Sequence, residues 1–383
     1  MRIALIRRKF NPFGGAEKFI MRTIQGLRAF NISTAIIAES WIKQDDADVL
    51  GSQDWIKADV QGSSRAAKFL SFQESVATIL STHQFDLIQS HERLLGADIY
   101  RLGDGIHASW LARLAKVSPW YTKLWLKIDP YHRAVIRTEQ AMAKEPNLTY
   151  VANSQLVQQE LMDWYQVPAK RIVLIENGID TKAFTPTTDK AAAKIKLGLN
   201  PQLPTVLFVG SGFARKGAFE LLEAINMLPD FQLIIVGHDK QLTKLKKRVK
   251  ALQLEKRVLV TGPQSDVKPF LTAADIFCLP SLYDPFPNAV LEALCSALPV
   301  VVTNAVGIAN TLIHANAGLI CNKEPASIAQ ALLRAWGERE TMSRNALHLS
   351  KNYDLAKASQ QWLTLYNTLI KNKKENRIAH STH

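Results

Sequence analysis

Cysteine is scarce in this chain of 383 residues, and none of it is arranged as a motif. The three cysteines, Cys278, Cys295 and Cys321, are widely spaced and form no Cys-x-x-Cys pair. Isolated cysteines within apolar runs are typical of buried, reduced thiols, which argues against a disulfide framework or a zinc site. We therefore expect the protein to reside in a reducing compartment.

Long apolar runs are missing as well, since no stretch approaches the roughly 18 residues that a membrane-spanning helix needs. The opening MRIALIRRKF has a short apolar core followed by more cations, so it predicts a first strand and not a signal peptide. No zinc motif, RNP-like aromatic motif or basic recognition helix is visible, which argues against nucleic acid as a partner. The net charge of +13 still needs a reason, and the basic stretch 240–257 is interpreted as a solvated amphipathic helix.

Both halves of the chain alternate short β-branched runs with helical patterns, which is typical of parallel sheets covered by helices. We expect two doubly wound domains, residues 1–170 and 171–351, with a helix in 352–383 that returns to the first domain. The segment 185–204 is expected to be a surface excursion, and the tail from Lys371 to be frayed. Expected strands of the first half are 2–8, 33–39, 86–91, 97–103 and 148–153, and those of the second are 171–177, 205–210, 231–237, 257–262, 275–281, 299–303 and 319–322.

The motif GSGFARKG (210–217) lies between an expected strand and an expected helix, so its backbone amides can face an anion. It lacks the Lys-Ser or Lys-Thr of a Walker loop and the third glycine of a dinucleotide fingerprint. Arg215 can bind two phosphate oxygens at once, and Lys216 adds a point charge. The pair suits a pyrophosphate, with an ordinary turn bearing exposed cations as the alternative.

Two further stretches also follow expected strands. In NPFGGAEKF (11–19), Gly14 and Gly15 permit close approach of a ligand to the main chain. In SLYDPFPNAVLEALCSALPVVVT (281–303), a helix is predicted to begin near Asn288, with free amides that add to a phosphate site. Glu292 lies one turn farther, roughly 6 Å along the axis, where a carboxylate suits a diol.

Taken together, the motifs PFGGAEKF, VGSGFARKG, QSDVKPFLTAADIF and LEALCSALPVVVT resemble those of the retaining glycosyltransferases of family four, which have the GT-B fold. The likeness spans nearly the whole chain. It is similar above all to the enzymes that add glucose to the inner heptose of a lipopolysaccharide core. The resemblance implies two facing Rossmann-like domains, with the second binding a nucleotide sugar and the first binding the acceptor.

The resemblance also implies a role for each matching residue. Arg215, Lys216 and Asp284 are expected to be catalytic together with Asp104, which occupies the place of a cleft aspartate in RLGDGIHASW. Asp284 stands where the family usually has a glutamate, so its side chain is shorter by about 1.5 Å and the donor sugar stays open. The expected substrate-binding residues are Gly14, Gly15, His91, Asn153, Gly210, Gly212, Asp266, Val267, Pro280, Ser281, Asn288, Ala289, Val290 and Glu292.

Chemically, retention of configuration needs either a nucleophile or departure and attack on one face of the sugar. No convincing nucleophile is present, so the resemblance implies a front-face reaction in which Arg215 and Lys216 stabilise the leaving phosphate. No cofactor and no metal are expected. The Asp-x-Asp of DDAD (45–48) is interpreted as part of a solvated loop.

Residues 107–137 hold three tryptophans and six Lys or Arg against one Asp, a net charge of +5. Aromatic and basic residues favour the interface of an anionic bilayer, and each cation near its surface contributes about 1 kcal/mol. This segment predicts a peripheral site on the cytoplasmic face of the bacterial inner membrane, where a lipid-linked glycan acceptor would be met. The alternative is a helix packed on the sheet with its aromatics inward.

The favoured function is transfer of glucose from UDP-glucose to a lipopolysaccharide core. Alternatives are UDP-galactose or UDP-N-acetylglucosamine as donor, another glycolipid as acceptor, or a non-catalytic carbohydrate-binding protein. A phosphorylase of the same fold would need lysine-bound pyridoxal phosphate, which we do not expect.

Overall fold

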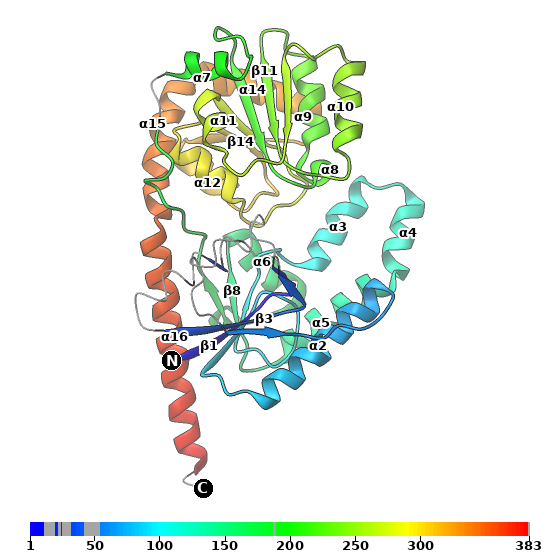
Figure 1. Ribbon diagram of the computed structural model, residues 1–383, viewed down its shortest axis with the longest axis vertical. Coiled ribbons are helices and arrows are strands. Elements are labelled where there is room, and N and C mark those ends of the chain that lie inside the picture. The colour runs from blue at the N-terminus through cyan, green and yellow to red at the C-terminus, as the bar shows by residue number, and fades with distance from the viewer. Residues whose placement is uncertain (11–19, 22–23, 25–31, 42–53, 187–188, 382–383) are drawn as a thin grey trace. The chain divides into compact units, whose positions relative to one another are not determined.

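The computed structural model describes residues 1–10, 20–21, 24, 32–41, 54–186 and 189–381. The chain forms two compact units, shown in Figure 1. The first contains Met1–Asn177 and Ala356–His383, and the second contains Gly178–Leu355. Each unit has its own parallel sheet, as the alternating sequence pattern predicts.

The sheet of the first unit has the order β5-β3-β1-β6-β7-β8-β9, and every pairing within it is parallel. A separate two-stranded ladder joins β2 (Lys9–Phe10) to β4 (Ser40–Trp41). The main strands are β1 (Arg2–Ile6), β3 (Ser33–Ala38), β5 (Asp54–Lys57), β6 (Leu87–Ser90), β7 (Ile99–Arg101), β8 (Thr149–Ala152) and β9 (Ile172–Leu174).

Strand β9 corrects one expectation, because the segment 171–177 was assigned to the second sheet. Instead, Ile172 pairs with Tyr150 of β8, at the edge of the first sheet. Helix α6 (Gln155–Tyr165) connects β8 to β9 as a crossover, which makes the two strands neighbours in one sheet. The first unit accordingly runs to Asn177.

The last helix of the chain, α16 (Leu355–Ser381), packs on the first sheet as predicted. Trp362, Leu365 and Tyr366 are buried against residues of β1, β3 and β8. The helix continues beyond the expected start of fraying at Lys371, and Lys373 Nζ lies 2.7 Å from Asp98 Oδ2. Further helices in the described part of this unit are α2 (Arg65–Thr82), α3 (His107–Val117), α4 (Trp120–Ile128) and α5 (Pro130–Lys144).

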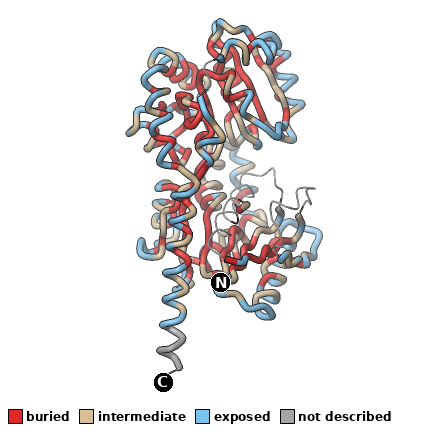
Figure 2. The backbone as a smooth tube through the Cα atoms, turned by 60° about the vertical axis from the view of Figure 1, so that its left-hand side comes forward, coloured by how far each residue is buried: buried red, intermediate tan, exposed pale blue. Residues whose placement is uncertain are grey.

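The sheet of the second unit has the order β12-β11-β10-β13-β14-β15, again entirely parallel. Its four inner strands are buried on both faces, which explains why each reads as a nearly continuous apolar run. Figure 2 shows the buried residues concentrated in the interior of each unit. The strands are β10 (Thr205–Val209), β11 (Gln232–Val236), β12 (Val258–Gly262), β13 (Ile276–Leu279), β14 (Val300–Thr303) and β15 (Gly318–Cys321).

Within the stretch 185–204, which was expected to be a surface excursion, α7 (Lys190–Lys196) is docked onto the second unit. Lys194 is buried, and its Nζ lies 2.6 Å from Asp275 Oδ2 and 2.8 Å from Leu203 O. A buried ammonium paired in this way ties the helix to the sheet. The remaining helices are α8 (Phe213–Lys216), α9 (Ala218–Asn226), α10 (Leu242–Ala251), α11 (Lys268–Ala273), α12 (Asn288–Cys295), α13 (Ala309–His314), α14 (Pro325–Gly337) and α15 (Arg339–Ser350).

Candidate functional site

The strand order of the second sheet reverses between β10 and β13, which lie side by side. In open parallel sheets, ligands bind beyond the carboxyl ends of the strands at such a switch point. The loop after β10 carries the motif 210–217, and the loop after β13 carries the segment from Pro280 to Asp284. Two of the predicted motifs therefore meet at one edge of this sheet.

Two glycines of the first loop are required by close packing. A Cβ on Gly210 would lie 2.6 Å from Lys216 Cδ, so the lysine side chain lies directly over that glycine. Gly217 has a φ of +82°, and a Cβ there would lie 2.3 Å from the carbonyl oxygen of Pro280. The absence of a side chain at Gly217 permits the two loops to approach each other, and the absence of one at Gly210 leaves room for the Lys216 side chain.

Arg215 and Lys216 converge on the carboxylate of Asp284. Lys216 Nζ lies 3.1 Å from Asp284 Oδ2, and Arg215 Nη1 lies 3.9 Å from the same oxygen. Arg215 Nη1 also donates to the carbonyl oxygen of Tyr283 at 2.7 Å. The Asp284 carboxylate is nearly buried, whereas 36% of the Arg215 side chain is exposed. The Lys216 ammonium is thus largely buried, whereas the Arg215 guanidinium group still reaches solvent.

The main chain around Asp284 is fixed from two sides. Leu282 N donates to Arg215 O at 2.7 Å, and Asp284 N donates to Ala305 O at 3.1 Å. Gly307 N in turn donates to Asp284 O at 2.9 Å. The carboxylate is therefore held in place by backbone contacts and does not depend on the cations alone.

Helix α12 begins at Asn288 as predicted, directly after Pro287. One predicted amide is already engaged, because Val290 N donates to Pro287 O at 3.1 Å and the Val290 side chain is in the core. Asn288 and Ala289 lie in the first turn at half-buried positions, and Glu292 follows one turn later at 8% exposure. The helix start therefore offers fewer amides than expected.

Pro280 and Ser281 are buried between the loops, and Thr303 Oγ1 donates to Ser281 O at 2.5 Å. Asp266, by contrast, is exposed, and its Oδ1 accepts from Lys268 N at 3.0 Å at the start of α11. Val267 is half-buried against the core of the same unit. These two residues follow β12, which is two strands away from the switch point.

A hollow in the second unit adjoins the same glycine-rich loop. It is lined by Gly212, Ala214 and Arg215 from this loop and by residues 238–241, which follow β11. Asp239 connects the two segments, since its Oδ2 accepts from Phe213 N at 3.0 Å. Asp239 therefore helps to orient the loop that carries Arg215.

In the first unit, the strand order reverses between β1 and β6, and a second cluster of charged residues follows these strands and β7. Arg7 Nη1 lies 3.2 Å from Glu92 Oε1 and 3.3 Å from Asp104 Oδ2. The Asp104 side chain is 59% exposed, so it can be reached from solvent. One guanidinium group, from the strand next to β6, thus orients two carboxylates.

Charge sets the protonation of these carboxyl groups. Desolvation would raise the pKa of Asp104, but Arg7, Arg93 and Arg101 together outweigh it and lower that pKa. Burial raises the pKa of Glu92, against the opposing effect of Arg7 and with a further contribution from Asp104. The pKa values of these two neighbouring carboxyl groups are therefore shifted in opposite directions.

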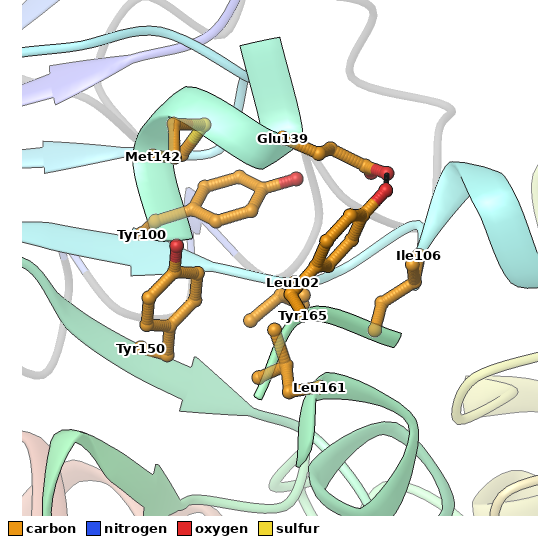
Figure 3. A pocket seen from close by; sticks show the side chains of 8 residues that line it. All are labelled: Tyr100, Leu102, Ile106, Glu139, Met142, Tyr150, Leu161 and Tyr165. Carbon is orange, nitrogen blue, oxygen red and sulfur yellow. Dashed lines mark hydrogen bonds between the residues drawn. The ribbon is translucent and has the colours of Figure 1, made fainter. Parts of the chain in front are cut away.

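Hydrogen bonds to Glu139 hold the loop that carries Asp104 in place. Glu139 Oε1 accepts from Arg93 Nε at 2.6 Å and from His107 N at 2.9 Å, and Oε2 accepts from Tyr165 OH at 2.6 Å. Arg93 Nη2 also donates to Gly105 O at 2.9 Å, next to Asp104. Figure 3 shows Tyr165 directed at Glu139 along a narrow pocket whose other lining residues are Tyr100, Leu102, Ile106, Met142, Tyr150 and Leu161.

Two other predicted residues of this unit follow neighbouring strands. His91 follows β6 and is buried, with Nε2 2.9 Å from Gln89 Nε2. Asn153 follows β8 and is also buried, directly before Ser154, whose Oγ accepts from Val157 N at 3.3 Å at the start of α6. The predictions Gly14 and Gly15, and the Asp-x-Asp within 45–48, lie outside the described residues.

Arg7 and Glu92 belong to none of the motifs in the sequence and were not predicted as site residues. Arg7 was part of an expected strand, and Glu92 followed His91 without a recognisable pattern of its own. A usable signal was the parallel pairing of β1 with β6, because His91 N donates to Ile6 O at 2.9 Å and so brings the two strand ends together.

Helix α4 exposes its apolar side chains instead of burying them. Trp120 is 76% exposed and Trp125 48%, and Tyr121, Leu124 and Ile128 are exposed as well. Leu126 is the buried member of this helix. The aromatics therefore point outward, contrary to the alternative of a helix with an inward aromatic face. In the described residues no helix is both long and apolar enough to cross a bilayer.

A pair of histidines connects helices α3 and α5 next to α4. His107 Nε2 of α3 lies 3.0 Å from His132 Nδ1 of α5, and the Trp125 ring meets His132 edge-on at 5.7 Å. Burial, with a contribution from Arg93, lowers the pKa of His107 to about 3. A neutral pair of histidines thus lies where α3 and α5 meet. Across the described ranges, no three His, Cys, Asp or Glu side chains are placed to hold a metal ion.

Two family models match the chain in tandem. Residues 13–183 match the model described as Glycosyltransferase Family 4, and residues 189–348 match Glycosyl transferases group 1. Among curated proteins, the chain is 25% identical over 375 residues to the lipopolysaccharide glucosyltransferase WaaG of Escherichia coli K12, covering 93% of this chain and 96% of that protein. It is 31% identical over 220 residues to an Escherichia coli UDP-Gal:alpha-D-GlcNAc-diphosphoundecaprenol alpha-1,3-galactosyltransferase, covering 54% of this chain and 57% of that protein.

Solved structures support the same architecture. The crystal structure of WaaG matches with a TM-score of 0.83 at 22% identity, over 95% of this chain and 99% of that one. The sucrose-phosphate synthase of Thermosynechococcus elongatus matches with a TM-score of 0.79 at 20% identity, over 97% of this chain and 100% of that one. At these identities the likeness concerns the fold, which is GT-B.

Proposed function

The chain belongs to glycosyltransferase family 4, and from that premise we propose that it moves a hexose from a nucleotide sugar onto a lipid-linked glycan of the lipopolysaccharide-core type. UDP-glucose is the leading donor, because a relative that is similar over 93% of this chain is named as a lipopolysaccharide glucosyltransferase. A solved structure of the same fold holds UDP-glucose. UDP-galactose is the first alternative, since the relative with 31% identity is a galactosyltransferase.

The observation that carries the proposal is the convergence of Arg215 and Lys216 on one carboxylate at the switch point of the second sheet. Holding two cations in place before a ligand arrives reduces the reorganisation needed when negative charge develops. A diphosphate leaving group fits this arrangement, with Arg215 binding two of its oxygens and Lys216 contributing a nearly buried charge.

In the proposed reaction, the leaving phosphate of the donor accepts the proton of the acceptor hydroxyl on the face from which it departs. The bond from the sugar to phosphate breaks as the bond to the acceptor oxygen forms, and configuration is retained. Arg215 and Lys216 stabilise the charge that grows on the phosphate, and Asp284 orients sugar hydroxyls. No metal is assigned a step, because the two cations supply this stabilisation.

The other predicted residues take supporting roles. Glu292 binds the ribose hydroxyls, amides at Asn288 and Ala289 face the phosphates, and the backbone at Asp266 and Val267 contacts the base. In the first unit, Asp104 and His91 contact sugar hydroxyls. The exposed aromatics and lysines of α4 place the protein on an anionic membrane surface, where a lipid-linked acceptor resides.

The phosphate role of Lys216 predicts a selective loss of affinity in Lys216→Ala. A charge-assisted hydrogen bond contributes about 1.5–3 kcal/mol, so binding of UDP should weaken at least about tenfold while binding of uridine changes little. Calorimetric titration of both ligands measures the difference. The matched control is Lys246→Ala, which replaces an exposed lysine of α10 and should leave the affinities for UDP and uridine unchanged.

A turnover assay distinguishes an enzyme from the alternative, a non-catalytic carbohydrate-binding protein. A panel of nucleotide sugars, with and without a truncated lipopolysaccharide acceptor, should release nucleoside diphosphate for one donor above all others. Binding of sugars without any release would contradict the enzymatic proposal.

A further inference from the structure

A buried chain of hydrogen bonds runs from the C-terminal helix to His91 at the end of β6. Tyr366 OH of α16 donates to Gln89 Oε1 at 2.6 Å, and Gln89 Nε2 lies 2.9 Å from His91 Nε2. Tyr366 and Gln89 have no exposed surface, and His91 is 5% exposed. One short hydrogen bond thus joins Gln89 to Tyr366, 277 positions farther along the chain, and a second short contact joins Gln89 to His91.

The charge of Arg101 sets the direction of this chain. Its guanidinium group is buried and interacts electrostatically with Tyr366. A nearby positive charge attracts the lone pairs of the phenol oxygen, so the O–H points away from it and donates to Gln89 Oε1. With Oε1 facing Tyr366, the amide nitrogen of Gln89 must face the ring of His91.

The same surroundings fix the protonation of His91. Burial, followed by the charges of Arg101 and Arg7, holds the pKa of His91 well below its usual value, so the ring is neutral. Neutral imidazole has one donor and one acceptor nitrogen. Because Gln89 donates to Nε2, the proton must reside on Nδ1.

We propose that Tyr366 is a positioning residue for His91, which it holds through Gln89 as a neutral ring with its proton on Nδ1. Resting on the proposed function, this fixes which ring nitrogen of His91 carries a proton at a strand end that the proposal assigns to the acceptor sugar. It also excludes His91 as the general base, since the nitrogen that could accept a proton is bonded to Gln89.

Tyr366→Phe tests the direction of the chain. Without the phenol, Gln89 Oε1 loses its donor, and the amide can rotate so that oxygen faces His91 Nε2. The proton then moves to Nε2. We expect the ring-nitrogen NMR shifts of His91 to report a proton on Nδ1 in the unmodified protein and a change toward Nε2 in Tyr366→Phe.

Tyr165→Phe is the matched control, because it removes another hydrogen-bonded tyrosine hydroxyl of the same unit. It should leave the nitrogen shifts of His91 unchanged. A proton on Nε2 of the unmodified protein would overturn the proposal without any variant. Unchanged His91 shifts in a folded Tyr366→Phe would overturn it as well.

A second variant covers the case in which Tyr366→Phe does not fold. Gln89→Glu keeps the size of the side chain but presents only acceptor oxygens to His91 Nε2, and a carboxylate favours a protonated imidazole, so Nε2 should become protonated. If the shifts stay as in the unmodified protein, Gln89 does not control the ring and the proposal fails.

Sugar transfer gives an independent measurement. In Tyr366→Phe we expect kcat/KM to fall about three- to tenfold, the effect of one misdirected hydrogen bond. Equal kcat/KM in the presence of a changed tautomer would show that transfer does not depend on the tautomer of His91. Failure of the unmodified protein to transfer any sugar would refute the proposed function, whereas the nitrogen shifts would still decide the role of Tyr366.

Discussion

At the scale of single residues, the two clusters at the strand ends use opposite arrangements of charge. In the second unit, one carboxylate, that of Asp284, contacts two cations. In the first unit, one cation, Arg7, serves two carboxylates. In the proposed reaction, the first arrangement supplies positive charge for phosphate, and the second supplies acceptor oxygens for sugar hydroxyls.

Arg7→Met is predicted to raise the pKa of Asp104, because Arg7 is the leading cation that favours its charged form. The carboxylate would then be lost at a higher pH than in the unmodified protein. The acid limb of the pH profile of kcat/KM should move to higher pH, and carbon NMR titration of the aspartate carboxyls should report the same direction.

Arg2→Met provides the control, because it removes an exposed arginine that pairs with Asp54 at the surface of the same sheet. Its acid limb should coincide with that of the unmodified protein. An acid limb that stays in place in Arg7→Met would mean that Asp104 does not control the profile.

At the scale of elements, the sequence was sufficient where a pattern is local. The run TVLFV followed by glycines predicts β10 and its loop because burial on both faces favours β-branched and apolar residues. The sheet to which a strand belongs is a long-range property, and β9 was therefore assigned to the wrong one. The pairing of Arg7 with Glu92 was likewise not predictable from either segment alone, since it depends on which strands are neighbours.

Helix α4 is predicted to bind anionic membranes through its exposed tryptophans. Trp120→Ser combined with Trp125→Ser removes the two largest exposed apolar side chains of this helix and should reduce sedimentation with vesicles that contain anionic lipid. The reduction should be at least about tenfold in the partition coefficient, given about 1.5 kcal/mol or more for each buried aromatic.

Trp164→Ser is the comparison for this experiment, because Trp164 is 45% exposed on another helix, α6. It should leave vesicle binding as it was. Equal sedimentation of the double variant and the unmodified protein would remove α4 from the membrane site.

At the scale of the whole molecule, the first unit depends on a helix that comes from the far end of the chain. Trp362 of α16 is 2% exposed and packs on Tyr366 with ring centroids 5.6 Å apart. Trp362→Ala should destabilise the first unit by about 3–5 kcal/mol, the usual cost of replacing a buried aromatic by alanine.

Calorimetry in the presence of UDP measures this effect separately for the two units, provided that UDP stabilises the second one. The transition that responds to UDP should stay in place in Trp362→Ala, and the other should move to lower temperature. A single transition that moves as a whole would show that the two units unfold together.

The placement of α16 also has a consequence for how the protein is made. Ribosomes release the strands of the first sheet long before they release Trp362, Leu365 and Tyr366, which cover the face formed by Ile3, Leu5 and Val151. The second sheet and its helices are encoded entirely between these two events. During translation, the second unit is complete first, and the first unit keeps an uncovered apolar face until Trp362, Leu365 and Tyr366 have been synthesised.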